Sequence, residues 1–263
     1  MNTESPIPGG RLNRGKLVRL GDWVLRPADE DPAIEQLIIK VGRVFSGVPR
    51  TFGRDAQGRL KLQWIDGEVS KGFDEGEERG RTRLLSVGAL LRELHDSTVD
   101  IASQMEPTPF SLLDPSGIRE VICHGDPGPG NTVFRDDVAY AFIDWELASP
   151  GRRAWDLAIA LRYWSPFRSP ANMKGAHKHL DPWQRAEWLL EGYSASTQLR
   201  LESLKLLPLN QKINAEYVIR RLKSGDQAVY EEWVAKGGLK RLEDDASWFA
   251  DQKEALTEGR WPK

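Results

Sequence analysis

The feature that most constrains the fold of this chain is a short β-rich segment inserted between helices. Residues 120–143 alternate and turn as strands do, and Asp136-Asp137 supplies a tight hairpin turn. Apolar residues recur at spacings of three and four on both sides, which predicts amphipathic helices over 81–94 and 154–164. The strands expected within the segment are 121–123, 131–134 and 138–143. A chain of this kind is predicted to be an α+β protein.

The loop between the first two of these strands carries the polar residues of most interest. It is too rich in proline and glycine for regular structure, and it holds His124 and Asp126 ahead of Asn131. Asp144 directly follows the apolar run 139–143, and a hairpin would bring it beside Asn131. An amide oxygen and carboxylates that converge on one point suit Mg²⁺, with phosphate oxygens completing its shell. This chemistry is the basis of phosphoryl transfer.

The first 70 residues predict a small sheet with one helix. The expected strands are 17–20, 23–26 and 59–65, and the helix spans 33–44 with Asp31 as its N-cap. A turn and a polar, glycine-rich run follow Ile65. We therefore predict an N-terminal β-rich domain over 1–67 and a mainly helical domain over 68–263.

The C-terminal part is predicted to be helical. A loop over 165–180 precedes a helix over 182–193, for which Asp181 is the expected N-cap. Breaks expected near Pro208, 224–225 and 237–238 divide the rest into several further helices.

Composition excludes several classes of protein. Lys and Arg total 37 against 39 Asp and Glu, a net charge of −2, so no overall positive field favours nucleic acid or an anionic membrane. No apolar run reaches the length of a membrane span, and the N-terminus lacks the pattern of a secretory signal. The single cysteine, Cys123, cannot form an internal disulfide, and we interpret it as a small core residue. A cytoplasmic location is the simplest expectation.

Three motifs together resemble a known family, the aminoglycoside phosphotransferase and choline-kinase-like branch of the protein-kinase-like fold. The order and the spacing match in His124-Gly125-Asp126-x4-Asn131, Ile143-Asp144-Trp145-Glu146 and Asp156-Leu157-Ala158. Gly125 stands where protein kinases have an arginine. More narrowly, the segments 9–12 and 21–27 resemble the small phosphotransferase-like proteins called trifolitoxin immunity proteins.

The resemblance implies two lobes, a shortened N-terminal β lobe that covers a nucleotide and a mainly helical C-terminal lobe, with ATP or GTP between them. It implies that Asp126 orients and partly deprotonates a substrate hydroxyl, and that Asn131 and Asp144 hold Mg²⁺ against the phosphates. His124 and Asp156 would support the catalytic loop. The implied function is transfer of the γ-phosphate to a hydroxyl of a small molecule, either antibiotic-like or a metabolite.

The resemblance also places the nucleotide contacts of the first lobe. Arg26 falls where kinase-like enzymes use a lysine to bind phosphates, and the two cations differ in geometry. Glu35 would either pair with Arg26 or be an exposed glutamate. The backbone of Trp64, Ile65 and Asp66 falls at the connection between the lobes and would bind the adenine or guanine ring; an ordinary strand end is the other interpretation.

The sequence gives the least information about the acceptor substrate. Four tryptophans among carboxylates would form an acidic aromatic cleft for a cationic acceptor such as an amino sugar, although core tryptophans and solvated carboxylates are the simpler interpretation. These residues are Trp183, Trp188, Trp233 and Trp248, with Glu187, Glu191, Glu231, Glu232, Asp244, Asp245 and Asp251. The alternative function is a weak or inactive kinase-like protein that sequesters a toxin, a peptide or a nucleotide. The sequence does not indicate an oligomeric state.

Overall fold

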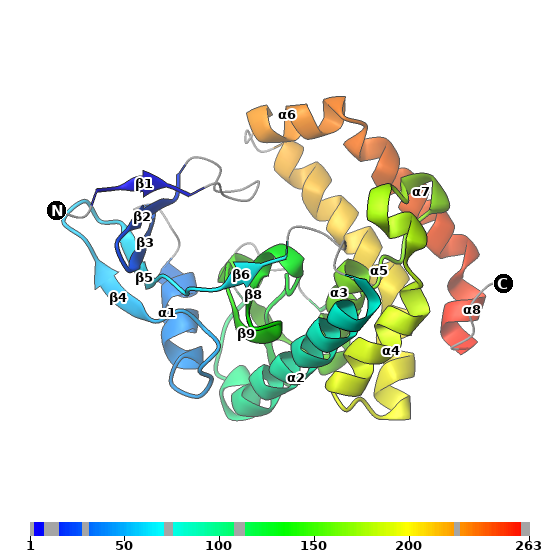
Figure 1. The fold of residues 1–263 in the computed structure, drawn as a ribbon, viewed down its shortest axis with the longest axis horizontal. Helices are drawn as coiled ribbons and strands as arrows, with labels where there is room; N and C mark the ends of the chain where they lie inside the picture. The colour runs from blue at the N-terminus through cyan, green and yellow to red at the C-terminus, as the bar shows by residue number, and fades with distance from the viewer. Residues whose placement is uncertain are drawn as a thin grey trace.

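The computed structural model describes residues 3–7, 16–27, 32–70, 76–107, 114–223 and 227–258. A sheet with one helix lies at one end of the molecule, helices form the other end, and a β-hairpin lies between them (Figure 1). The expectations for 9–12, for Asp31 and for the break at 224–225 fall outside the described residues.

The N-terminal sheet has five antiparallel strands in the order β1-β2-β3-β5-β4. The turn at Gly21-Asp22 joins β2 to β3 as predicted, and β3 pairs with β5 in the register Trp23↔Gln63 to Arg26↔Leu60. Helix α1 (Pro32–Val41) buries Ile34, Leu37, Ile38 and Val41, the stripe expected from their spacing. The strands are β1 (Ser5–Pro6), β2 (Val18–Leu20), β3 (Trp23–Arg26), β4 (Thr51–Arg54) and β5 (Leu60–Gln63).

The central hairpin of β8 (Thr132–Arg135) and β9 (Val138–Phe142) forms as the sequence predicts. Asp136 and Asp137 both have positive φ, 50° and 62°, as a two-residue hairpin turn of this twist requires. Strand β6 (Glu68–Val69) adds to β8, so residues just after the predicted boundary pair with the hairpin. The division at residue 67 itself stays a prediction.

Two strands that are distant in sequence anchor the loop before the hairpin. Strand β7 (Val121–Cys123) pairs with β10 (Ser149–Gly151), a partner that the sequence did not predict. Helix α2 (Gly76–Ala102) packs against β7 and β9, and α3 (Arg153–Trp164) also contacts β7. The core therefore surrounds the predicted catalytic loop, and Cys123 lies in it with 1% exposure.

Helix α5 (Thr197–Lys223) corrects the sequence prediction, because it continues through Pro208 instead of breaking there. A proline inside a helix costs about 3 kcal/mol. Leu204 and Leu207, in the preceding turn, are both buried, and burial of each leucine contributes roughly 1.5–3 kcal/mol. The other C-terminal helices are α4 (Pro182–Gly192), α6 (Gln227–Ala235), α7 (Gly238–Asp251) and α8 (Lys253–Glu258).

Several helix ends agree with the predicted signals. The Asp181 carboxylate accepts hydrogen bonds from the backbone of Trp183 and Gln184 at the start of α4. Gly237 has φ 76° and precedes α7, at the predicted break. The predicted loop 165–180 contains two short 3-10 turns, η3 (Pro170–Asn172) and η4 (Gly175–His179).

Helices α2 and α4 approach each other closely through a glycine on each helix. A Cβ added at Gly88 would overlap the carbonyl oxygen of Leu189 and lie 2.6 Å from the backbone nitrogen of Tyr193. A Cβ added at Gly192 would overlap the carbonyl oxygen of Leu85. These neighbours are backbone atoms, which cannot rotate away.

Gly88→Ala is therefore expected to lower the free energy of unfolding by about 1–2 kcal/mol. Overpacking against backbone costs roughly 1–3 kcal/mol, which exceeds the gain of about 1 kcal/mol in helix propensity. Urea unfolding would measure the change. Ala89→Ser, at the exposed neighbouring position, is the control and should cost less than about 0.7 kcal/mol. A stabilised Gly88→Ala variant would contradict the tight helix contact.

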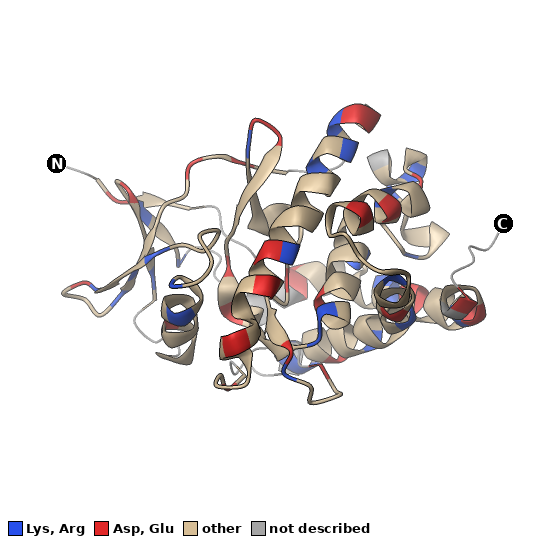
Figure 2. Cartoon of the chain, turned by 90° about the horizontal axis from the view of Figure 1, so that it is seen from below, with Lys and Arg blue, Asp and Glu red and all other residues tan. Residues whose placement is uncertain are grey.

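Basic and acidic residues are interspersed over both parts of the molecule (Figure 2). Helices α2, α5 and α7 each carry residues of both charge signs, in keeping with the small net charge. Within the described ranges, no helix combines the length and the apolar character needed to cross a bilayer.

Candidate active site

The loop after β7 is held by its own backbone and by His124. The His124 ring is fully buried, and burial lowers its pKa, so the ring is neutral. Its Nε2 donates to the carbonyl of Ile143 at 3.1 Å, and its Nδ1 accepts from the backbone N–H of Asp126 at 3.2 Å. One ring thus joins the loop that carries Asp126 to the residue before Asp144.

Gly125 explains why this loop departs from the protein-kinase pattern. Its φ is 79°, and an added Cβ would overlap the carbonyl oxygen of Leu147. Positive φ and this close approach both favour glycine. An arginine at this position would not fit against the backbone of 147.

Asp126 and Asn131 contact each other across the loop. The Asn131 Nδ2 donates to the Asp126 backbone carbonyl at 3.0 Å and to its carboxylate at 2.7 Å. Burial raises the pKa of Asp126 to about 6; the Tyr163 hydroxyl lowers it by hydrogen bonding, and the nearby Asp144 charge raises it further. The carboxylate of Asp126 is therefore desolvated and more basic than an ordinary aspartate.

The hairpin brings Asp144 beside Asn131, as its spacing predicts. The backbone N–H of Ile143 donates to the Asn131 carbonyl at 2.9 Å, one step beyond the pairing of Thr132 with Phe142. Asp144 has φ 66° and ψ 68°, a left-handed conformation that aspartate tolerates. This turn ends the extended strand at the residue whose carboxylate faces the site.

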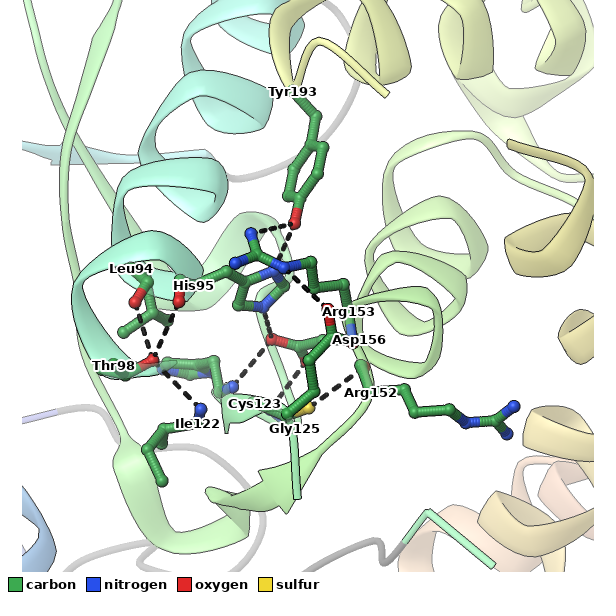
Figure 3. A network of polar contacts seen from close by, with 12 residues as sticks. Leu94, His95, Thr98, Ile122, Cys123, Gly125, Arg152, Arg153, Asp156 and Tyr193 are labelled. Atoms are coloured by element: carbon green, nitrogen blue, oxygen red, sulfur yellow. Dashed lines mark hydrogen bonds and ion pairs between the residues drawn. The ribbon is translucent and has the colours of Figure 1, made fainter. Parts of the chain in front are cut away.

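Asp156 ties the start of α3 to the loop (Figure 3). Its carboxylate accepts from the backbone N–H of His124 at 2.8 Å and of Gly125 at 3.0 Å. Burial opposes ionisation, but the hydrogen bonds from His95 and from the Gly125 N–H leave the pKa of Asp156 below its usual value. Asp156 is therefore a carboxylate that fixes the loop backbone.

His95 and Tyr193 extend this network, and sequence reasoning missed both. His95 Nε2 lies 3.1 Å from the Asp156 carboxylate, and its Nδ1 lies 2.8 Å from the Tyr193 hydroxyl (Figure 3). A carboxylate only accepts, so Nε2 carries the proton and Nδ1 accepts from Tyr193. The available signal was position, because His95 falls four residues after Leu91 and continues the apolar stripe one residue beyond the predicted helix 81–94.

Arg26 is buried at the end of β3 and turns toward the hairpin. Its guanidinium pairs with Glu146 and lies 3.3 Å from the Asp144 carboxylate. Glu35 instead pairs with Arg54 at 3.2 Å. The suggested Glu35–Arg26 pair is therefore wrong, because a carboxylate from the hairpin side takes the place of the one expected from α1.

Two cavities meet at Asn131 and Asp144, which line both. The first, here called the sheet-side cavity, has a volume of about 350 Å³ and is mainly apolar. Arg26, Trp64 and Ile65 line it, with further residues of β3, β5, β6 and β8. Asp66 is not among its lining residues; its carbonyl accepts from Arg135 and its carboxylate from the Trp64 indole, and its contact with the base stays a prediction.

The second, the helix-side cavity, has a volume of about 450 Å³ and lies between the catalytic loop and helices α3, α5, α6 and α7. Asp126 lines it together with Arg162, Tyr163 and Arg168, three residues that sequence reasoning missed. Burial raises the pKa of the Tyr163 hydroxyl to about 12, and its hydrogen bond with Asp126 adds to this effect. No sequence signal singled out these side chains: Arg162 and Tyr163 lie on the mainly apolar helix α3, and Arg168 lies in the predicted loop after it.

The acidic aromatic cleft is not assembled as a unit. Trp183, Trp188 and Trp248 pack on the core, as the simpler interpretation held, whereas Trp233 lines the helix-side cavity. Four of the carboxylates pair with basic residues elsewhere, and Asp245 lines the cavity. The pairs are Glu187–Arg200, Glu191–Arg81, Glu232–Lys236 and Asp244–Lys240.

The junction of the two cavities has the donors that Mg²⁺ prefers. Within the described part of the chain, Oδ1 of Asn131 and Oδ2 of Asp144 have no hydrogen-bond partner. The described residues contain no cluster of three His, Cys, Asp or Glu side chains suited to a metal. Mg²⁺ commonly binds through one or two protein oxygens, with phosphates and water completing its shell. The residues present therefore fit Mg²⁺ held together with a nucleotide.

Comparison with known proteins supports the resemblance. Residues 110–189 match the family model of the phosphotransferase enzyme family. The trifolitoxin immunity protein of Rhizobium leguminosarum bv. trifolii is 32% identical over 169 residues. That match covers 61% of each chain, so this chain spans about three fifths of the length of its curated relative.

Solved structures show the same fold at low sequence identity. A choline/ethanolamine kinase family protein from Mesorhizobium loti is 17% identical, with a TM-score of 0.58 over 98% of this chain and 94% of that one. An aminoglycoside phosphotransferase in a ternary complex with streptomycin and ATP is 12% identical, with a TM-score of 0.61 over 95% and 94%. The chain thus has the two-lobed protein-kinase-like fold, and its residues 110–189 resemble the phosphotransferase enzyme family.

Proposed function

We propose that this protein transfers the γ-phosphate of ATP or GTP to a hydroxyl group of a small molecule, with Mg²⁺. The observation that carries the proposal is the junction of the two cavities. Asn131 and Asp144 line both cavities, and Asp126 lines the helix-side cavity next to them. A phosphate donor on one side and a hydroxyl acceptor on the other would meet at these residues.

The sheet-side cavity suits the nucleotide. Its apolar walls would enclose a base near the backbone of Trp64 and Ile65, and Arg26 at its inner end would bind phosphate in place of the usual lysine. Mg²⁺ held by Asn131 and Asp144 would neutralise charge on the phosphates. ADP or ATP in the solved relatives supports this assignment.

Asp126 would act on the acceptor. Its carboxylate would accept a hydrogen bond from the hydroxyl and take its proton as the oxygen attacks the γ-phosphorus. A new O–P bond forms, and the bond to the bridging oxygen of the nucleoside diphosphate breaks. Asn131 and Tyr163 hold the carboxylate in place, and His124 holds the backbone on which it stands. The two-domain division at residue 67 is part of this proposal.

Thermal shift with ATP or GTP, with and without Mg²⁺, tests the nucleotide site. Binding at 100 times Kd stabilises a protein by about 2.7 kcal/mol. We expect a Mg²⁺-dependent shift and slow phosphate release by the wild type. Asp144→Asn is expected to weaken Mg²⁺-nucleotide binding at least about tenfold, because it removes a charged ligand.

Asp136→Asn is the matched control. Asp136 and Asp144 both have positive φ and lie on the same hairpin, but Asp136 is exposed at its far end. Asparagine tolerates this backbone conformation at both positions. Equal nucleotide shifts in the two variants and the wild type would remove Asp144 from the site, and the absence of any nucleotide shift would overturn the proposal.

A second candidate, a kinase-like protein that binds without turnover, is favoured by the contacts of Arg26. Arg26 pairs with Glu146 and with Asp144, so these interactions compete with phosphate and with Mg²⁺. The relative named as an immunity protein is compatible with this candidate. A nucleotide shift without phosphate release or transfer to any tested acceptor would favour it.

A further inference from the structure

The helix-side cavity is lined by three arginines that the proposed phosphoryl transfer does not use, beside the carboxylates of Asp126, Asp144 and Asp245. Arg162, Arg168 and Arg241 line it, whereas Arg26 lines the sheet-side cavity. The three guanidinium groups come from α3, from the segment after α3, and from α7. Their convergence bears on the chemical class of the acceptor.

Arg162 is buried, with 9% exposure, and makes no ion pair with a carboxylate of the described residues. Its Nε donates to the neutral amide oxygen of Asn210 at 2.9 Å, and its Nη2 lies buried without an acceptor among the described residues. Its Cζ lies 4.3 Å from the centroid of the Tyr163 ring, and Tyr163 hydrogen-bonds Asp126. This guanidinium therefore lies close to the proposed base.

Arg168 is similarly short of partners. Its Nε is buried, and no described group accepts a hydrogen bond from it. Burial lowers the pKa of Arg168, and the charge of Arg162 adds to this effect, while Asp245 opposes it. Asp245 Oδ1 already accepts from the Ser169 N–H and the Asn172 amide, each at 2.8 Å. Across the described ranges, no ion pair joins Arg162 or Arg168 to a carboxylate.

An arginine keeps its proton in proteins, so burial does not remove its charge. Two neighbouring guanidinium groups that make no contact ion pair are costly even with the charges of Asp126 and Asp245 nearby, and a bound anion would relieve both desolvation and mutual repulsion. Guanidinium forks match carboxylate and phosphate oxygens in geometry. A cavity of about 450 Å³ holds a small hydroxylated molecule.

We propose that the acceptor carries an anionic oxygen group, a carboxylate or a phosphate, which Arg162 and Arg168 bind while its hydroxyl faces Asp126. This inference rests on the proposed function, and it replaces a cationic acceptor with an anionic one. Anchoring at the arginines would hold the hydroxyl near the carboxylate of Asp126 and the donor phosphate. Atoms balance as in the transfer above, and the anionic group itself is unchanged.

Thermal shift with simple probes tests the anion site without knowledge of the acceptor. Malonate represents a carboxylate and inorganic phosphate a phosphate; choline and kanamycin are cationic probes, all at constant ionic strength set with sodium chloride. We expect a saturable shift with malonate or phosphate and none with the cations. The anion that binds more tightly identifies the source of the negative charge.

Arg168→Met and Arg162→Met are each expected to weaken the anion affinity at least about tenfold, because a bidentate contact is lost. Arg220→Met, at an exposed position of α5, is the control and should keep the wild-type shift. Arg168→Met should also raise the melting temperature without anion, because it removes an unpaired buried charge. If Arg162→Met does not fold, the less buried Arg168 decides the test.

Equal anion shifts in wild type and Arg168→Met would overturn the inference, as would the absence of a saturable anion shift or a shift with the cations alone. The Mg²⁺-nucleotide shift is measured on the same samples. If that shift persists while the anion shift is absent, only the anionic acceptor is overturned. If the nucleotide shift itself is absent, the proposed function is overturned.

Discussion

Asp126→Asn is expected to lower phosphoryl transfer, and the slow phosphate release to water, by about 10²–10⁴-fold. Asparagine has the same shape, and its one oxygen can still accept from the Asn131 amide, so the loop should keep its conformation. It cannot take a proton from the attacking hydroxyl. The loss should therefore fall on kcat, with the affinity for Mg²⁺-nucleotide changed less than about threefold.

The measurement is single-turnover phosphate release with saturating nucleotide, beside the thermal shift on the same preparation. Asp136→Asn, on the exposed hairpin turn, should match the wild type in both assays. Full turnover in Asp126→Asn would remove Asp126 from catalysis. Lost nucleotide binding would mean that Asp126 acts on the fold or on the donor, not on the acceptor.

The local parts of this site could be predicted because neighbouring residues determine them. The hairpin turn at Asp136-Asp137 fixes which residues of β8 and β9 face each other, and so it brings Asn131 to Asp144. The proline- and glycine-rich loop likewise indicated an irregular segment that holds Asp126. In both cases the chain closes within about twenty residues.

Contacts between distant segments could not be predicted in the same way. Glu35 on α1 was one candidate partner for Arg26, but Glu146, 120 residues away along the chain, provides the carboxylate. Strand β7 pairs with β10, and Asp156 meets His95 across 61 residues. Such partners depend on how the lobes and helices pack, which apolar periodicity within one helix does not encode.

The acceptor side of the site could be predicted from the sequence even less well. Its cavity is assembled from α3, α5, α6 and α7, whose order in space has no counterpart in local sequence signals. Tryptophans among carboxylates indicated an acidic cleft, yet most of those carboxylates form ion pairs with lysines and arginines. The positive charge near Asp126 comes instead from Arg162 on α3 and Arg168 in the segment after it.

Asp156→Asn is expected to lower the free energy of unfolding by about 3–5 kcal/mol, the cost of breaking a buried charged network. Its carboxylate accepts from two backbone N–H groups and from His95, and all of these groups are buried. An amide offers only one oxygen and turns its NH₂ toward donors. Because the pKa of Asp156 is lowered, its contribution is present in full at neutral pH and is lost only as the pH falls through that lowered value.

Urea unfolding and the melting temperature measure this effect, with an expected fall of roughly 6–20 °C. Asp100→Asn, at an exposed position of α2, is the control and should change stability by less than about 0.5 kcal/mol. His95→Asn should cost less than Asp156→Asn, because both backbone N–H groups keep their acceptor. The double variant should be more stable than the sum of the two losses predicts, since both changes remove the same contact.

A loss in Asp156→Asn no larger than in Asp100→Asn would contradict the network. If folded Asp156→Asn protein is obtained at low temperature, its phosphate release should also fall, because the N–H groups of His124 and Gly125 no longer fix the loop that carries Asp126. Asp156 is thus a positioning residue. An intact rate in a clearly destabilised variant would separate the two roles, leaving Asp156 as a contributor to stability whose loop keeps its geometry through His124 alone.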